Sequence, residues 1–239
     1  MNIALILSGG TGKRLGSDIP KQYISVKGSM IITRCLLKVL ECKKIDGIHI
    51  VADEKWRDRI VSEMKSEGVE SSVLKGFSDP GKTRQLSILN GLYGIREYAK
   101  PKDIVIVHDA ARPNVSEALL NACVDECKFY DGVIPVLPMK DTVYLSNDGT
   151  SITRVLDRSR IYAGQAPEAF RLGKYIEANE RLIPDDILNI NGTTEPAVLA
   201  GLNVCMIHGE ESNYKITTKE DLDRYISSVG SRGILSLLK

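Results

Sequence analysis

The sequence predicts an α/β protein in which a mostly parallel sheet is covered by helices on both faces. Short apolar segments rich in β-branched residues recur along the chain, and segments with helical spacing of apolar residues lie between them. The longest apolar segments are almost continuously hydrophobic, which is typical of strands buried on both faces. Strands and helices in alternation are joined by right-handed crossovers. We therefore expect a Rossmann-like fold.

Six strands are expected where β-branched and other apolar residues cluster, at residues 3–7, 47–51, 72–74, 103–107, 132–137 and 204–207. Six helices are expected from apolar residues at helical spacing, at residues 31–40, 56–66, 84–98, 116–129, 173–182 and 219–228. Thr218 precedes the last helix and is expected to cap its N-terminus. Each predicted strand is thus followed by a helix, as a parallel sheet requires.

One segment interrupts this alternation and predicts a β-hairpin. Residues 142–145 lead into Asn147-Asp148-Gly149, and residues 152–156 return, which is a strong local turn signal. An isolated two-stranded hairpin is marginally stable in water. The hairpin, taken with its flanks as residues 139–159, therefore either packs on its own domain or reaches a second subunit.

Length and charge limit the class of protein. At 239 residues, the chain is expected to form one domain over residues 1–239. The 32 Lys+Arg balance the 31 Asp+Glu, which argues against a broad cationic surface for nucleic acid and leaves room for a local cluster of positive charge. No apolar run is long enough to span a membrane. Five cysteines without a CxxC pair fit a reducing compartment, so we expect a cytoplasmic protein.

A glycine-rich loop follows the first predicted strand and consists of Ser8, Gly9, Gly10, Thr11 and Gly12. Glycines at the carboxyl end of a strand let backbone N–H groups approach a phosphate closely, and Arg14 and Lys21 add positive charge nearby. Leu15 stands where a dinucleotide fingerprint would need its third glycine. The loop therefore predicts a triphosphate site, with a plain strand-to-helix turn as the alternative.

A second segment, from Gly76 to Thr83, fits the GxxxxGK[ST] pattern of a phosphate-binding P-loop. Such a loop would make the protein an NTPase. Asp79 would place a negative charge inside the phosphate site, however, and Pro80 lacks an amide donor. The P-loop interpretation stays as a remote alternative.

Asp109 follows the strand predicted over residues 103–107, after His108. This position lies in the crevice where open α/β sheets bind ligands. A carboxylate oxygen is the ligand that Mg²⁺ prefers, so Asp109 is the candidate metal ligand. The alternative is a turn aspartate before a proline-containing loop. Whether Asn213 assists the metal is left open. Lys215, near the end of the chain, is a candidate for a further phosphate-binding cation.

Taken in order, these motifs resemble one family across essentially the whole chain, the methylerythritol-phosphate and ribitol-phosphate cytidylyltransferases. The matching motifs lie at residues 9–14, 20–22, 84–87, 109–113, 141–142, 157–158, 165–167 and 213–217. The resemblance implies transfer of CMP from CTP to a small sugar-alcohol phosphate, with release of pyrophosphate and a requirement for Mg²⁺. It also argues against the P-loop, because Lys82 falls in the stretch that this family uses near the base.

On the nucleotide side, the resemblance implies roles for the loop from Ser8 to Gly12 and for Arg14 and Lys21 at the triphosphate. Lys215 would join Lys21 at the α-phosphate, and these two residues with Arg14 are the expected catalytic residues. Arg84 and Ser87 would bind the nucleotide, and Ser87 with nearby backbone would read cytosine.

On the acceptor side, the resemblance implies that Asp109, Arg112, Thr142 and Arg158 hold the sugar-alcohol phosphate. The hairpin arm of this family reaches the neighbouring subunit, so Thr142 and Arg158 would act across a homodimer. The physical chemistry agrees, because two anions must meet in the transition state and cations are needed to overcome their repulsion. The acceptor oxygen is already a nucleophile, so no Ser/His pair is required. Retention of these cations argues against a non-catalytic nucleotide-binding module.

The sequence departs from the family on the acceptor side. Both branches usually carry Thr-Pro-Gln where this chain has Ala166-Pro167-Glu168, and Thr-Asp where it has Thr193-Thr194. Loss of a hydroxyl and a carboxylate would leave substrate hydroxyls without partners. We therefore expect ribitol 5-phosphate or a related polyol phosphate as the acceptor, and 2-C-methyl-D-erythritol 4-phosphate of isoprenoid synthesis as the alternative.

Overall fold

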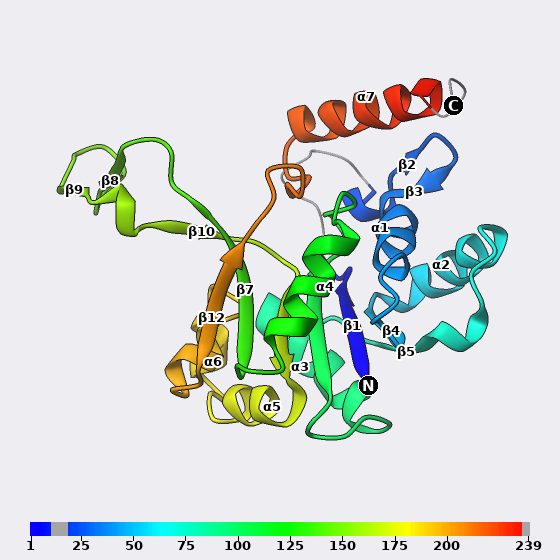
Figure 1. Cartoon of the computed structure of the whole chain (residues 1–239), viewed down its shortest axis with the longest axis horizontal. Coiled ribbons are helices and arrows are strands. Elements are labelled where there is room, and N and C mark those ends of the chain that lie inside the picture. The colour runs from blue at the N-terminus through cyan, green and yellow to red at the C-terminus, as the bar shows by residue number, and fades with distance from the viewer. Residues whose placement is uncertain (11–18, 236–239) are drawn as a thin grey trace.

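The computed structural model describes residues 1–10 and 19–235 and contains a central mixed sheet flanked by helices (Figure 1). Within the described residues the sheet has eight strands, in the order β10-β7-β11-β6-β1-β4-β5, and β12 pairs with β7. Its strands are β1 (Asn2–Leu7), β4 (Gly47–Val51), β5 (Leu74–Ser78), β6 (Ile104–Asp109), β7 (Gly132–Pro138), β10 (Tyr162–Gly164), β11 (Glu168–Arg171) and β12 (Val204–His208). The mostly parallel α/β fold predicted from the sequence is confirmed.

Parallel pairing dominates the sheet. β1 lies between β4 and β6 and pairs in parallel with both, β4 pairs in parallel with β5, and β7 pairs in parallel with β12. β10 and β11 run antiparallel and were missed in the sequence. They follow one another along the same side of β7, and the Gln165–Pro167 stretch separates them. β11 closes the gap between β6 and β7.

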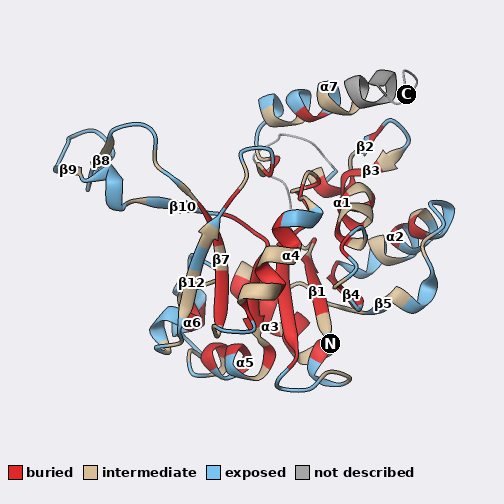
Figure 2. Cartoon of the chain, in the orientation of Figure 1, coloured by how far each residue is buried: buried red, intermediate tan, exposed pale blue. Residues whose placement is uncertain are grey.

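Helices cover both faces of the sheet, as the sequence predicts. The helices are α1 (Ile31–Leu40), α2 (Glu54–Ser66), α3 (Arg84–Arg96), α4 (Glu117–Glu126), α5 (Leu172–Glu180), α6 (Glu195–Leu199) and α7 (Lys219–Leu235). Core residues of α1, α2 and α4 pack against one face, and those of α3, α5 and α6 pack against the other. Alternate residues of β1 serve the two cores, with Ala4 and Ile6 on one side and Ile3 and Leu5 on the other. Figure 2 shows the central strands as the buried part of the molecule.

Two local predictions are wrong. The strand expected at residues 72–74 is a 3-10 turn over Ser71–Val73, and β5 begins at Leu74. Pairing decides the position of this strand, because Phe77 and Ser78 lie opposite Ile50 and Val51 of β4. α6 was also missed, since five residues are too few to show helical periodicity.

No helix among the described residues combines the length and apolar character needed to cross a membrane.

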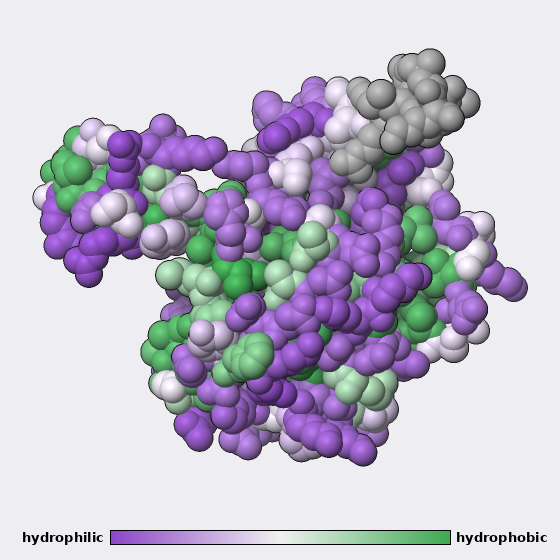
Figure 3. All heavy atoms as spheres, viewed as in Figure 1, coloured by the Kyte–Doolittle hydropathy of each residue, from purple (hydrophilic) through white to green (hydrophobic). Residues whose placement is uncertain are grey.

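The predicted hairpin is present and stands away from the body of the molecule (Figure 1). β8 (Val143–Leu145) pairs antiparallel with β9 (Arg154–Leu156) and with no strand of the central sheet. A second small hairpin, β2 (Ser25–Val26) with β3 (Ser29–Met30), precedes α1. We call residues 139–159 the arm. Its tip exposes Tyr144, Ile152 and Val155, with 54%, 65% and 58% of each residue accessible, and Figure 3 shows apolar atoms gathered there.

Candidate active site

A pocket of about 440 Å³ opens at the carboxyl ends of β1 and β6. Leu7 and Asp109, the last residues of the two strands, are register partners, so the loops that follow both strands face one cavity. The pocket is lined by Leu7, Gly9, Gly10, Lys21, Gln22, Gly81, Lys82, Thr83, Arg84, Ser87, Asp109, Ala111, Lys215 and Thr217. Its size and position are typical of a small-molecule site in an α/β sheet.

The turn after β1 is fixed by hydrogen bonds to two buried side chains, those of Gln22 and Tyr23. The Gln22 side-chain amide donates to the carbonyl oxygens of Ser8 and Gly10 at 2.6 and 2.7 Å. The Ser8 hydroxyl donates to the Tyr23 hydroxyl at 2.9 Å, so the Ser8 side chain is engaged in the interior. Gly9 and Gly10 face the pocket. The other predicted residues of this loop, Thr11, Gly12 and Arg14, lie outside the described residues.

Gly9 allows a close approach between two loops. A Cβ atom placed on Gly9 would lie 2.5 Å from the Cβ of Pro80, so any side chain at this position would collide with the loop after β5. The turn after β1 and the loop at residues 79–83 therefore form one continuous wall of the pocket.

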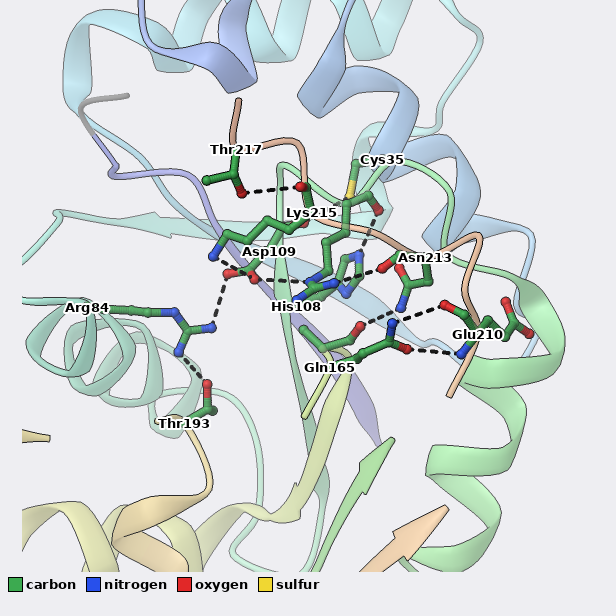
Figure 4. A network of polar contacts seen from close by, with 12 residues as sticks. Cys35, Arg84, His108, Asp109, Gln165, Thr193, Glu210, Asn213, Lys215 and Thr217 are labelled. Carbon is green, nitrogen blue, oxygen red and sulfur yellow. Dashed lines mark hydrogen bonds and ion pairs between the residues drawn. The ribbon is translucent and has the colours of Figure 1, made fainter. Parts of the chain in front are cut away.

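Asp109 lies at the centre of a cluster of cations (Figure 4). Its Oδ1 lies 3.1 Å from Nη2 of Arg84, and its Oδ2 lies 3.0 Å from Nζ of Lys215 and 3.3 Å from Nε of Arg112. Burial raises the pKa of Asp109, but Arg84, Lys215 and Arg112 together lower it more, so its net pKa lies well below the usual range. The carboxylate is the counter-ion of the cluster.

These donors do not fit a protein-held magnesium ion. Both oxygens of Asp109 already serve cations, and no group of three or more His, Cys, Asp or Glu side chains within residues 1–10 and 19–235 could hold a metal. Asn213 has a buried Oδ1 without a hydrogen-bond partner, but its Nδ2 donates to the carbonyl oxygen of Ala166 at 2.7 Å. The expectation that Asp109 is a metal ligand gains no support from this donor set.

The loop that carries Lys215 is anchored on both sides of that residue (Figure 4). The Gln165 side chain accepts from the N–H of Glu210 and donates to its carbonyl oxygen, both at 3.0 Å. Arg112 donates from Nη1 to the carbonyl oxygen of Asn213 at 2.7 Å. The N–H of Ile216 donates to the carbonyl oxygen of Ala111 at 2.9 Å. The sequence marked Gln165 only as part of a family motif and did not predict this role.

The segment that fits the P-loop pattern forms another side of the pocket. It leads from β5 into α3, whose N-terminus is capped by the Thr83 side chain. The Gly81 N–H donates to the Ser87 hydroxyl at 3.0 Å rather than pointing into a phosphate site. Asp79 forms an ion pair with Arg57 at 2.6 Å. The geometry therefore does not support the P-loop interpretation, while Gly81, Lys82 and Ser87 line the same pocket as Gly9.

The structure brings only part of the predicted acceptor site together. Arg112 does not itself line the pocket but contacts Asp109, which does, whereas Thr142 and Arg158 belong to the arm and are absent from the pocket lining. Arg158 instead donates from Nη1 to the carbonyl oxygen of Lys140 at 2.6 Å. Arg84, predicted as a nucleotide-binding residue, reaches from α3 to Asp109 and to the Thr193 hydroxyl.

A mostly parallel sheet with a glycine turn and clustered cations at its carboxyl edge is typical of α/β enzymes that act on nucleotides. The family of 2-C-methyl-D-erythritol 4-phosphate cytidylyltransferases (IspD) matches residues 2–226. The chain belongs to this family and is therefore a nucleotidyltransferase of the cytidylyltransferase type.

Curated relatives carry two acceptor names. The chain is 35% identical over 226 residues to the 2-C-methyl-D-erythritol 4-phosphate cytidylyltransferase of Geobacter metallireducens, covering 92% of this chain and 93% of that one. It is 28% identical over 222 residues to the ribitol-5-phosphate cytidylyltransferase of Streptococcus agalactiae, covering 92% of each. The chain spans about half, 55%, of the bifunctional IspD/IspF enzyme of Maricaulis maris, to which it is 32% identical.

Solved structures agree with the fold. The crystal structure of 4-diphosphocytidyl-2C-methyl-D-erythritol synthase from Anaerococcus prevotii superposes with a TM-score of 0.79 at 25% identity, covering 96% of this chain and 98% of that one. The 2-C-methyl-D-erythritol 4-phosphate cytidylyltransferase of Francisella tularensis gives a TM-score of 0.78 at 25% identity, covering 94% of this chain and 97% of that one.

Proposed function

We propose that this protein transfers CMP from CTP to a small sugar-alcohol phosphate and releases pyrophosphate. The observation that carries the proposal is the cation cluster at the carboxyl end of β6, where Arg84, Arg112 and Lys215 surround Asp109, and Lys21 lines the same pocket as Asp109. Such a cluster suits a reaction in which a phosphomonoester of charge about −1.5 to −2 must approach a triphosphate.

In the proposed reaction, an oxygen of the acceptor phosphate attacks the α-phosphorus of CTP. A new P–O bond forms, the bond from the α-phosphorus to the bridging oxygen breaks, and pyrophosphate leaves with the electron pair. Lys21 and Lys215 are proposed to bind the α-phosphoryl oxygens, together with Arg14. These charges complement the transition state better than the ground state, which is the condition for raising kcat.

The remaining nucleotide contacts follow from the lining of the pocket. Gly9 and Gly10 are proposed to present their backbone to the triphosphate, and Ser87 with the backbone near Gly81 to contact cytosine. Magnesium enters this proposal only as the ion bound to CTP, as part of the substrate. That ion would neutralise phosphate charge there.

The arm is proposed to complete the acceptor site of a neighbouring subunit. Thr142 and Arg158 lie outside the pocket of their own chain, and the arm ends in exposed apolar residues (Figure 3). A two-stranded hairpin of this length is at best marginally stable in water unless something covers it. A second copy of the chain would cover the tip and receive Thr142 and Arg158 beside its own Arg112.

Mixing two inactive variants tests the shared site. An Arg158→Ala protein and a Lys21→Ala protein are each expected to have little activity. Each shared site needs Lys21 from one subunit and Arg158 from the other, and every site of each variant lacks one of these two residues. Random subunit exchange makes half of the dimers mixed, and each mixed dimer has one intact site, so about a quarter of the parent activity is expected to return. Pyrophosphate release after exchange measures it. Proven exchange without recovery, or a monomer at micromolar concentration, would contradict the shared site.

The acceptor is tested by comparing substrates. We propose a polyol phosphate of the ribitol 5-phosphate type, because Ala166 stands where the family usually has a threonine hydroxyl and an unpaired substrate hydroxyl costs about 1 to 3 kcal/mol. A preference of about 10-fold to 100-fold in kcat/KM over 2-C-methyl-D-erythritol 4-phosphate is expected. The measurement is pyrophosphate release from CTP with each acceptor in parallel. A preference for the methylerythritol substrate would assign the enzyme to isoprenoid precursor synthesis instead.

A further inference from the structure

A buried carboxylate lies behind the pocket and has no role in the reaction proposed above. Glu168 on β11 is only 7% exposed, and it lies opposite Val107 of β6, two residues before Asp109. The Thr194 hydroxyl donates to its Oε2. Burial raises the pKa of Glu168, and the contact with Thr194 and the charge of Arg84 partly oppose this rise. Retaining a charged group in such a place requires a partner of opposite charge.

Arg84 is that partner, and a short series of contacts links the two. The Arg84 guanidinium donates from Nη2 to Asp109 at 3.1 Å and from Nη1 to the Thr193 hydroxyl. Thr193 is almost fully buried, and its carbonyl oxygen accepts from the Tyr175 hydroxyl at 2.6 Å. Figure 4 shows Arg84 reaching between Asp109 and Thr193. Thr194, the next residue in the chain, completes the link through its hydrogen bond to Glu168.

Asp109 and Glu168 lie on adjacent strands, and Arg84 is linked to both of them, directly to Asp109 and indirectly to Glu168. Asp109 contacts the guanidinium directly, whereas Glu168 acts on it through Thr193 and Thr194 and through its charge. We propose that Glu168 is a positioning residue, which fixes Arg84 in the orientation that places its guanidinium in the pocket beside Asp109. The kinetic part of this proposal rests on the proposed function.

The test first removes the carboxylate from residue 168 and then restores one at residue 194, its hydrogen-bond partner. Glu168→Gln keeps the shape of the side chain and removes its charge, and it is expected to lower kcat about 10-fold, because a misplacement of about 1 Å can cost up to ~100-fold. The KM for CTP is expected to stay within about twofold, since Gly9, Gly10 and Ser87 are unchanged. The double variant E168Q/T194D restores a carboxylate at the same contact, and kcat is expected to return to within about threefold of the parent.

Glu63→Gln is the matched control. Glu63 on α2 also accepts from a threonine hydroxyl, that of Thr33 at 2.7 Å, and also has an arginine nearby, Arg59 at 3.5 Å, but it does not line the pocket. It is expected to leave kcat unchanged. Melting temperatures of all variants separate a kinetic effect from loss of folded protein. A normal kcat for E168Q, or a loss that E168Q/T194D does not repair in a folded protein, would overturn the proposal.

Crystal structures of the variants give a readout that does not depend on activity. Arg84 is expected to leave Asp109 in E168Q and to contact it in E168Q/T194D and E63Q. An unchanged Arg84 in E168Q overturns the inference even if no acceptor supports turnover, and absence of turnover in the parent counts against the proposed function alone. If E168Q does not fold, Thr194→Val removes the contact and keeps the carboxylate. Displacement of Arg84 in that variant would support the proposal, and its absence would refute it.

Discussion

Replacement of Lys215 by alanine is expected to lower kcat about 100-fold or more, whereas the KM for CTP changes far less. The proposed contact of Lys215 is with the α-phosphoryl group, whose charge distribution changes most in the transition state. The loop anchors at Glu210, Asn213 and Ile216 hold the lysine in place, so its charge is available without rearrangement. Steady-state pyrophosphate release measures both constants. The same result is expected for Lys21→Ala.

Lys219→Ala provides the control for this experiment. Lys219 is exposed at the start of α7 and lies outside the pocket, so its loss is expected to leave kcat unchanged. Near-parent turnover in the Lys215→Ala protein would show that the α-phosphoryl assignment of Lys215 is wrong.

Replacement of Asp109 by asparagine is expected to lower the free energy of unfolding by about 3 kcal/mol and to remove most of the activity. The change leaves Arg84, Arg112 and Lys215 together without their shared counter-ion. The figure lies at the low end for breaking a buried ion pair, because Arg84 and Lys215 keep 35% and 33% exposure and are partly screened by water. Urea unfolding at pH 7 measures it. Pyrophosphate is expected to stabilise the variant more than the parent, since it supplies the missing anion.

The pH dependence of stability gives an independent check. The folded-state pKa of Asp109 is lowered, so its contribution to stability is present above the unfolded pKa of about 4 and is lost as pH falls through the lower folded value. The stability difference between parent and variant should therefore shrink as pH falls below about 4. Asp125→Asn, which removes exposed ion pairs with Lys44 and Lys128, should cost less than about 1 kcal/mol. A difference between the parent and Asp109→Asn that grows in acid would contradict the counter-ion role.

Local patterns in the sequence were enough for the parallel part of the fold. β1 has a continuous apolar segment after Asn2, β4 is apolar apart from His49, and α1 has apolar residues at helical spacing, so their positions follow from burial alone. β11 is different, since its sequence Glu-Ala-Phe-Arg has charged residues at both ends. It becomes a strand because β6 and β7 leave a gap that its backbone can fill, and this is a contact between distant segments.

The sequence indicated which charged residues to consider for the site, but not which atoms they and their neighbours contact. Asp109, Lys21 and Lys215 were recognisable because charges follow or flank predicted strands and turns. The roles of Gln165 and Gln22 were not, because they depend on hydrogen bonds to backbone atoms that folding alone brings near. Ser8 was expected only as part of the nucleotide-binding loop, and the hydrogen bond from its hydroxyl to the buried Tyr23 hydroxyl could not be foreseen either.

The departures on the acceptor side also look different once folded. The sequence suggested that Thr194 represents the loss of a carboxylate from the site. In the structure the Thr194 hydroxyl contacts Glu168, the residue that stands where the family usually has glutamine. The contact therefore still contains one carboxylate, which belongs to residue 168 here and to the residue at position 194 in the usual family pattern. The expectation of a ribitol-type acceptor consequently depends on Ala166 rather than on Thr194.

The contact between Gly9 and Pro80 has a consequence for attempts to redesign nucleotide choice. A library that varies residues 79–83 to accept another base would also move the wall against which the glycine turn rests. On the proposed assignment of the base and the triphosphate, variants selected for a new base would then lose triphosphate alignment as a side effect, and activity screens would discard them. Keeping Pro80 and the α3 cap residue Thr83 fixed and varying Lys82 separates base choice from phosphate alignment. The shape of one turn thus sets which positions can be diversified independently.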